Sequence, residues 1–256
     1  MNGRGAAPRP ASGTTGAAVG DRLDVLRREL RQVAEPKRIP GARRALQVVS
    51  GGYGEGDTLL GVSVPHARAI ARRFSDLPLA SVVELLRSPI HEERLVALLL
   101  LARRFETGDD ALRERIFRMY LRNTAYVNNW DLVDTSAPAI VGAHLLDRPR
   151  APLHRLVRST SVWERRIAVV STLAFIRAGD HDATFRLAQA LLRDEHDLIR
   201  KAVGWMLREV GKRDEPRLIA FLERHADVMP RVMLRSAVEH LDAEVRRKLL
   251  EDTPRG

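Results

Sequence analysis

The sequence has 256 residues, 45% of them hydrophobic, and a formal net charge of +10 with an isoelectric point near 10.9. This length and apolar content suit one large domain or one elongated array, and they exclude wholesale disorder. The chain has no cysteine, which excludes disulfides, zinc ribbons, iron–sulfur clusters and thiol nucleophiles. Its eight histidines show no paired helical spacing, so we expect no metal and no cofactor.

The positive charge predicts an anionic partner, most simply nucleic acid. The longest apolar run, LVALLLLA (95–102), is too short to cross a bilayer, and residues 1–20 lack the apolar segment of a signal peptide. We therefore expect a protein of the bacterial cytoplasm or nucleoid that does not contact a membrane.

Three segments are predicted along the chain: a flexible tail (1–20), one repeat domain (21–250) and a short C-terminal tail (251–256). From residue 21 onward the apolar residues recur with a helical period, and no stretch alternates as a strand would. Asp21 is expected to cap the first helix, and Pro65 and Pro216 fall in first helical turns, where the missing N–H costs nothing.

The helices repeat at a spacing of about 36 residues, or twice that, which is typical of helix-pair repeats. Each unit has charges, then one basic residue, then an almost entirely apolar helix. These basic residues are Arg94, Arg166, Lys201 and Arg235, in the segments 92–105, 164–177, 198–213 and 229–241. We therefore predict an all-α fold, a HEAT-like α-solenoid in which antiparallel helix pairs form a right-handed superhelix.

The stretch NNWDLVD (128–134) places Trp130 and Asp134 four residues apart, and so on one face of a helix. One interpretation is structural: Asn128 and Asp131 form a capping box, Trp130 belongs to the core, and Asp134 caps a turn. The other interpretation is a site that needs an indole beside a carboxylate.

In the segment 198–213, Lys201, Trp205, Arg208 and Lys212 lie opposite the apolar face of the helix. Such a stripe suits nucleic acid, with cations on phosphates and an indole on sugar or base. The alternative is that Trp205 lies under the stem of Lys201 or Arg208, or beneath the next helix.

Arg166 begins an otherwise apolar helix and has two interpretations, a functional one and a structural ion pair with Glu164 or Asp194. Trp163 has apolar neighbours and is expected to belong to the core.

Several separated blocks resemble the DNA alkylation-repair glycosylases of the AlkD type, over roughly residues 25 to 245. They are YGEGDTLLGVSVPHARAIA (53–71), YVNNWDLVDTSAPAIVG (126–142), WERRIAVVST (163–172), IRKAVGWMLREVGKRD (199–214) and MPRVMLRSAVEHL (229–241).

The resemblance implies a superhelix that holds duplex DNA on its concave face and hydrolyses the N-glycosidic bond of cationic N3- and N7-alkylated purines, such as 3-methyladenine and 7-methylguanine. It implies base excision repair without a cofactor. The family's catalytic set falls on Asp134, Trp130, Arg166 and Trp205, with Arg166 preferred to Arg165 because of its spacing to Trp205. The expected DNA contacts are Lys201, Arg208, Lys212, Arg165, Arg231 and Arg235.

The chemistry fits these residue types. A cationic purine is already a good leaving group, so the protein has only to stabilise an oxocarbenium-like sugar and orient a water molecule. The carboxylate of Asp134 can do both, and the indole of Trp130 offers a π-surface to the same cation. Arg166 would hold a phosphate near the lesion. Lys201 and Lys212 are interpreted as phosphate contacts, so we expect no Schiff-base lyase step.

Two other classes remain open: a HEAT-repeat protein that binds DNA structures without catalysis, and a protein-interaction scaffold. The complete set of Trp130, Asp134, Arg166 and Trp205 favours the glycosylase over both, and the Trp205 stripe favours DNA binding over a scaffold. A monomer is expected.

Overall fold

The computed structural model describes residues 14–251, with side chains from Arg22 onward. Its α-helices are α1 (Thr14–Gln32), α2 (Ile39–Ala45), α3 (Val64–Arg73), α4 (Leu79–Leu86), α5 (His91–Thr107), α6 (Asp110–Arg122), α7 (Trp130–Ala137), α8 (Ala151–Leu156), α9 (Val162–Arg177), α10 (Asp182–Leu191), α11 (Asp197–Gly211), α12 (Glu215–His225), α13 (Arg231–Ala237) and α14 (Ala243–Glu251). Short helical segments are η1 (Pro36–Arg38), η2 (Thr124–Tyr126), η3 (Pro138–Gly142) and η4 (Ala226–Val228).

The described residues contain no β-strand, only one isolated bridge between Thr58 and Ile90. The first helix differs from expectation, because α1 begins at Thr14 and Asp21 therefore lies inside it rather than capping its start. The expected tails fall largely on residues 1–13 and 252–256, which lie outside the described part of the chain.

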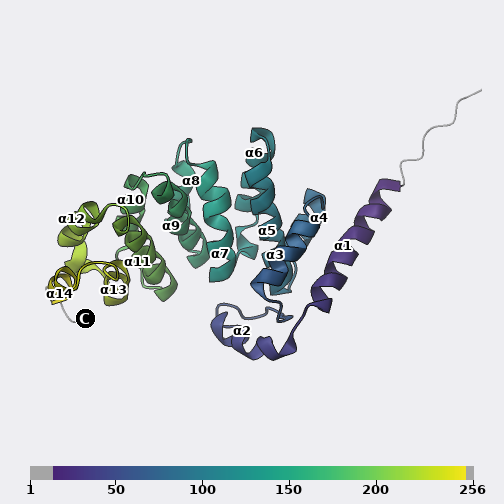
Figure 1. Cartoon of the computed structure of the whole chain (residues 1–256), viewed down its shortest axis with the longest axis horizontal. Coiled ribbons are helices and arrows are strands. Elements are labelled where there is room, and N and C mark those ends of the chain that lie inside the picture. The colour runs from purple at the N-terminus through teal and green to yellow at the C-terminus, as the bar shows by residue number, and fades with distance from the viewer. Residues whose placement is uncertain (1–13, 252–256) are drawn as a thin grey trace, which may run out of the picture.

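The helices follow one another along a curved array, from α1 at one end to α14 at the other (Figure 1). An inner row consists of α3, α5, α7, α9, α11 and α13, each packed against the next. The outer helices α4, α6, α8, α10 and α12 each pack on an inner helix. This two-row arrangement confirms the prediction of an all-α, HEAT-like solenoid.

Local sequence explains where the helices begin. Ser63, Asp109, Ser161 and Asp214 each accept a hydrogen bond from the backbone N–H three residues later, at 2.8 to 3.5 Å. The expected prolines lie in the first turns of α3 and α12. Apolar side chains of the inner helices then join one continuous core that runs from α1 to α14.

The repeated basic residues occupy comparable positions in the inner row. Arg94 is the fourth residue of α5, while Arg166, Lys201 and Arg235 are the fifth residues of α9, α11 and α13. The corresponding fifth residue of α7 is acidic, Asp134. Near the starts of these five inner helices, four therefore carry a basic residue and one, α7, carries a carboxylate.

Helix α7 does not end at Ala137 but continues into the π-helical segment η3, where the N–H of Ala143 bonds the carbonyl of Pro138. Gly142 closes this segment against α9: a Cβ at this position would lie 2.2 Å from the carbonyl oxygen of Ser171. A glycine is therefore required for the close approach of α9 to this part of the chain.

The loop between α2 and α3, residues 46–63, is fastened to α5 by one buried carboxylate. Glu92, which is 4% exposed, accepts hydrogen bonds from the backbone N–H groups of Leu60, Gly61 and Val62 at 2.8 to 3.3 Å. Gly61 has φ +80°, and a Cβ on it would lie 2.4 Å from the carbonyl of Glu35. The turn before α3 therefore depends on both residues.

Replacing Glu92 with alanine is expected to lower the free energy of unfolding by about 3 kcal/mol, because buried N–H groups lose their acceptor. Urea denaturation measures the change. Glu84→Ala is the control, because Glu84 pairs with Arg27 but its side chain is 58% exposed, and its loss is expected to cost about 0.5 kcal/mol. Equal losses in the two variants would contradict a structural role for Glu92.

Candidate functional site

A bidentate ion pair joins α7 to α9 at the middle of the inner row. Nε of Arg166 donates to Oδ1 of Asp134 at 2.9 Å, and Nη2 donates to Oδ2 at 2.7 Å. Nη1 of the same arginine donates to the backbone carbonyl of Leu198 in α11 at 2.6 Å. Three consecutive inner helices therefore meet at one guanidinium, and the geometry favours Arg166 over Arg165 as the partner of Asp134.

The two members of this pair differ in exposure. The side chain of Arg166 is 7% exposed, and that of Asp134 is 20% exposed. Burial raises the pKa of Asp134 above its ordinary value, Arg166 opposes this rise, and the negative charge of Asp131 adds to it. Asp134 thus offers an open carboxylate edge, whereas Arg166 has little surface left for a phosphate. Arg166 is better suited to orienting Asp134 than to binding DNA itself.

Trp130 lies one helical turn before Asp134, as expected, and Asn129 caps α7 by accepting from the N–H of Trp130 at 2.8 Å. The indole Nε1 donates to the carbonyl of Ala45 at 3.2 Å. The ring is half-buried and packs on a small apolar cluster formed by Ile39, Ala42, Leu46, Val48 and Leu59. Trp130 therefore joins α7 to α2 and the 46–63 loop.

Tyr53 belongs to the same corner, although the sequence had not singled it out. Its hydroxyl donates to the carbonyl of Ala45 at 3.3 Å, the acceptor that Trp130 also uses. Its ring meets Trp163 edge to face, with centroids 5.6 Å apart. Burial raises the pKa of Tyr53, while the neighbouring indole N–H of Trp130 and the charge of Arg166 oppose the rise. Trp163 packs against the main core, as expected, and also supports this tyrosine.

Trp205 lies in α11, and within residues 22–251 no hydrogen bond or ring contact joins it to Trp130, Asp134 or Arg166. It lies two helical turns after Leu198, whose carbonyl binds Arg166, so the two residues share one face of the helix. The indole is half-buried and packs at the edge of the main core. Its neighbours in the predicted stripe are partnered: Lys201 lies 3.7 Å from Asp197, and Lys212 lies 2.6 Å from Glu209.

The other predicted DNA contacts also have partners within the protein, with one exception. Arg208 pairs with Glu239, Arg165 donates to Asp194 at 2.7 Å, and Arg231 donates to the carbonyl of Leu250 at 2.5 Å. Arg235 is exposed and has no hydrogen-bond or ion-pair partner among residues 22–251. The exposed pairs are weak and can be exchanged for phosphate contacts, while the Arg165 pair is mostly buried.

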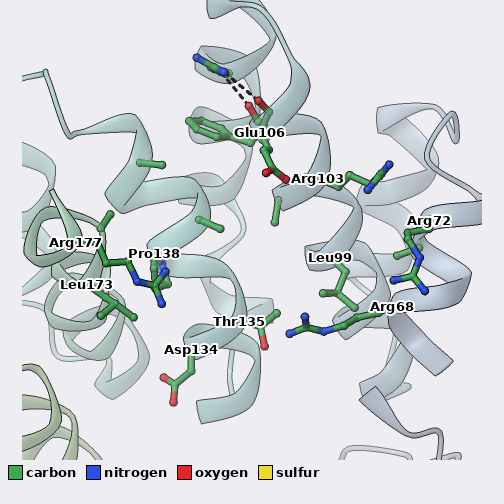
Figure 2. A pocket seen from close by; sticks show the side chains of 17 residues that line it. Arg68, Arg72, Leu99, Arg103, Glu106, Asp134, Thr135, Pro138, Leu173 and Arg177 are labelled. Atoms are coloured by element: carbon green, nitrogen blue, oxygen red, sulfur yellow. Dashed lines mark hydrogen bonds between the residues drawn. The ribbon is translucent and has the colours of Figure 1, made fainter. Parts of the chain in front are cut away.

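A groove of about 1000 Å³ extends from Asp134 along the inner row (Figure 2). Small and apolar side chains form its walls, with five arginines and two carboxylates. Arg68 and Arg177 point into it from opposite sides, with Asp134 and Thr135 between them. Its charged lining residues are Arg68, Arg72, Arg103, Arg113, Arg177, Glu106 and Asp134. The positive excess suits a polyanion.

Four of these arginines are exposed and have no hydrogen-bond or ion-pair partner within the described residues: Arg68, Arg72, Arg103 and Arg177. The sequence alone did not single them out. One signal was present, because Arg103 and Arg177 each lie near the C-terminal end of an apolar inner helix, two repeats apart. Their lack of partners, which makes them available to a ligand, depends on tertiary structure.

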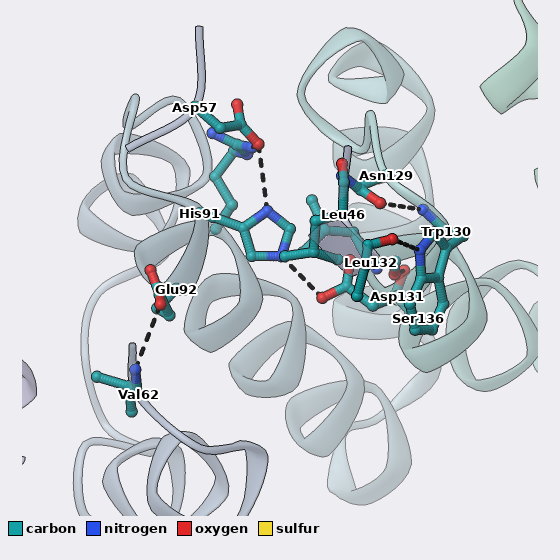
Figure 3. Close-up of polar contacts among 12 residues, drawn as sticks. Leu46, Asp57, Val62, His91, Glu92, Asn129, Trp130, Asp131, Leu132 and Ser136 are labelled. Atoms are coloured by element: carbon teal, nitrogen blue, oxygen red, sulfur yellow. Dashed lines mark hydrogen bonds and ion pairs between the residues drawn. The ribbon is translucent and has the colours of Figure 1, made fainter. Parts of the chain in front are cut away.

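A buried charged network adjoins Trp130 through the next residue, Asp131 (Figure 3). His91 Nδ1 lies 3.2 Å from Asp57 in the 46–63 loop, and Nε2 lies 2.7 Å from Asp131 in α7. Arg94 donates to the same Asp57 oxygen at 2.5 Å and to the carbonyl of Ser88 at 2.9 Å. Because carboxylates only accept, both ring nitrogens must carry hydrogen, so His91 is an imidazolium.

This network predicts a pH-dependent stability. His91 is 3% exposed; burial lowers its pKa, but the bonds to Asp131 and Asp57 outweigh this and raise the value to about 9. A raised folded-state pKa means that the stabilisation is complete below the unfolded value of about 6.5 and is lost as pH rises through about 9. We expect the free energy of unfolding to fall by about 3 kcal/mol between pH 6.5 and 9.5.

Urea denaturation at several pH values measures this loss, and His91→Gln is the control, because it removes the titrating group. Burial lowers the pKa of His144, so its contribution to stability has the opposite pH dependence and does not mimic the loss expected from His91. A midpoint that is constant between pH 6.5 and 9.5 in the wild-type protein would show that His91 is not held as a cation.

Within residues 14–251, no group of three or more His, Asp or Glu side chains is arranged to hold a metal ion. In the same part of the chain, no helix is both long and apolar enough to cross a bilayer.

Comparisons with known proteins concern the family and the fold. A family model described as "DNA alkylation repair enzyme" matches residues 26–241. Among solved structures, the chain is similar to one described as "Predicted DNA alkylation repair enzyme from Enterococcus faecalis", with a TM-score of 0.64 and 15% sequence identity, covering 82% of this chain and 97% of that chain. At this identity the likeness shows a shared fold. None of the curated proteins matches the sequence.

Proposed function

Because the chain belongs to the family of DNA alkylation repair enzymes, we propose that it is a DNA glycosylase that removes cationic N3- and N7-alkylated purines from duplex DNA. The observation that carries the proposal is a carboxylate, Asp134, held by Arg166 at the edge of a groove with four unpaired arginines. The groove supplies the polyanion site, and the carboxylate supplies the chemistry.

The reaction proceeds in the order that these positions allow. The arginines hold the phosphates of the duplex along the inner row. The alkylated purine, already cationic, leaves with the electrons of its N-glycosidic bond, and the sugar becomes an oxocarbenium-like cation. Asp134 opposes that charge and accepts a proton from the water that adds to the sugar. Trp130, one helical turn before Asp134, offers a π-surface to the same cation, and Trp205 on α11 would contact the duplex.

Arg166 takes a different role from the one the sequence suggested. Its guanidinium is engaged by Asp134 and by the Leu198 carbonyl, so it orients the carboxylate and favours the ionised form of Asp134. We therefore assign phosphate binding to the four unpaired arginines of the groove, Arg68, Arg72, Arg103 and Arg177. The proposed enzyme is monofunctional, because none of the groove's lining residues is a lysine that could form a Schiff base.

Incubation with methylated duplex DNA tests the proposal directly, with chromatography and mass spectrometry to identify released bases. We expect free 7-methylguanine and 3-methyladenine, with the DNA backbone left uncut. Tight binding to duplex without any released base would instead identify a non-catalytic DNA-binding repeat protein. Neither binding nor release would favour a protein scaffold.

A further inference from the structure

The buried network around His91 reaches the proposed carboxylate through Asp131. Asp131 lies three residues before Asp134 in α7, so the two carboxylates lie on neighbouring parts of one helix face. The charge of Asp131 opposes ionisation of Asp134. His91 lies between Asp131 and Asp57, and its cation offsets the nearer carboxylate.

The remaining charged and titratable groups around Asp134 are few. Arg166 approaches from α9, Asp131 from the same helix, and Tyr120 from α6, where its buried hydroxyl bonds Ser136 at 2.9 Å. Arg68 lies across the groove. Around His91 the charges are Asp57, Asp131 and Arg94. The network of His91, Asp57, Asp131 and Arg94 has zero net charge only while both ring nitrogens of His91 are protonated.

The same imidazolium also fixes the parts that hold Trp130. Its bond to Asp57 fastens the 46–63 loop, which carries Tyr53, and its bond to Asp131 fastens the first turn of α7, which carries Trp130. Tyr53 and Trp130 share the Ala45 carbonyl as acceptor. Loss of the cation would therefore weaken the two attachments that position the indole of Trp130, one through the 46–63 loop and one through the first turn of α7.

We propose that His91 is a positioning residue for the site: its imidazolium neutralises Asp131 and joins the 46–63 loop to α7, and thereby keeps Asp134 ionised beside a fixed Trp130. This inference rests on the glycosylase function proposed above, in which Asp134 must be charged. His91 itself is buried, so it would act through Asp131 and the 46–63 loop and not by contact with DNA.

Two variants test it, His91→Gln and the double variant His91→Gln/Asp131→Asn. The single variant leaves one uncompensated negative charge beside Asp134, and the double variant removes one charge of each sign. The carboxyl carbon of Asp134 is followed by NMR across pH in protein labelled with 13C-aspartate, and the pH profile of 7-methylguanine release is measured under single-turnover conditions. Unmethylated duplex binding checks that each protein is folded.

In His91→Gln, we expect the Asp134 titration and the acid limb of the rate profile to move up by about one pH unit. In the double variant, both are expected to return close to the wild-type midpoint. A purely structural role would lower stability and scale the rate at every pH without moving either midpoint, and that result would overturn the proposal. If wild-type protein releases no base, the glycosylase function fails, while the NMR titration still decides the role of His91.

Discussion

Asp134→Asn is expected to slow the release of 7-methylguanine by about 100- to 1,000-fold, since asparagine keeps the shape of the side chain but removes the charge that opposes the sugar cation. Affinity for undamaged duplex should stay the same or rise slightly, because a carboxylate beside phosphates repels them. The measurement is single-turnover excision at saturating protein, well below the melting temperature.

This substitution will also affect stability, because Asp134 is not an isolated side chain in an open groove. It neutralises Arg166, whose side chain is 7% exposed, so the asparagine variant is expected to lose about 2 kcal/mol of unfolding free energy. The matched control is Asp194→Asn, which breaks the similar Arg165–Asp194 pair, with Arg165 18% and Asp194 8% exposed. A comparable loss of stability with normal excision in the control would isolate the catalytic effect. If Asp134→Asn excised at the wild-type rate, the catalytic role would be refuted.

Replacing Arg68, Arg72, Arg103 and Arg177 together with alanine is expected to weaken duplex binding by about 1,000-fold near 0.15 M salt. Each phosphate contact contributes about 0.9 to the slope of log affinity against log salt concentration, so the slope should fall by about 3 to 4. Folding should survive, because these exposed side chains have no hydrogen-bond or ion-pair partners within the described residues. Fluorescence anisotropy across a salt titration gives both quantities.

The control makes the same change of net charge at four arginines outside the inner row of helices. Arg115, Arg155, Arg186 and Arg246 lie on α6, α8, α10 and α14, are exposed, and likewise lack hydrogen-bond or ion-pair partners within residues 22–251. Their replacement with alanine should lower affinity only slightly, through long-range attraction. Equal losses from the two sets would mean that net charge, and not the groove, determines binding.

The fold could be predicted from the sequence because helical repeats leave a local record. Helices α5 and α9 are buried around most of their circumference, and Arg94, Arg166, Lys201 and Arg235 marked comparable points near the starts of α5, α9, α11 and α13. The first boundary could not be placed so well, since an internal aspartate such as Asp21 resembles a cap when the residues before it are small and polar.

The site was only partly accessible from the sequence. Trp130, Asp134 and Arg166 could be proposed as site residues because four-residue spacing and the family resemblance pointed to them, and the structure places the last two in contact. The groove arginines were missed because a sequence pattern can predict that an arginine is exposed, but it cannot predict whether the charge of that arginine has a partner. Conversely, Arg208 was visible as part of a stripe, but its partner Glu239 is in another repeat. The partner of a side chain depends on the superhelix, which no short window of sequence contains.

The π-helical segment after α7 sets the phase of the helix on its two sides. One extra residue in a turn rotates everything that follows by about 100° relative to an uninterrupted α-helix. Before it, Asp134 and Thr135 face the groove; at its last residue, Gly142 faces α9. The site is thus specified by helix phase as well as by residue type. Deleting a single residue between 138 and 142 would change which side chains line the groove downstream while leaving Asp134, Arg166, Trp130 and Trp205 in the sequence.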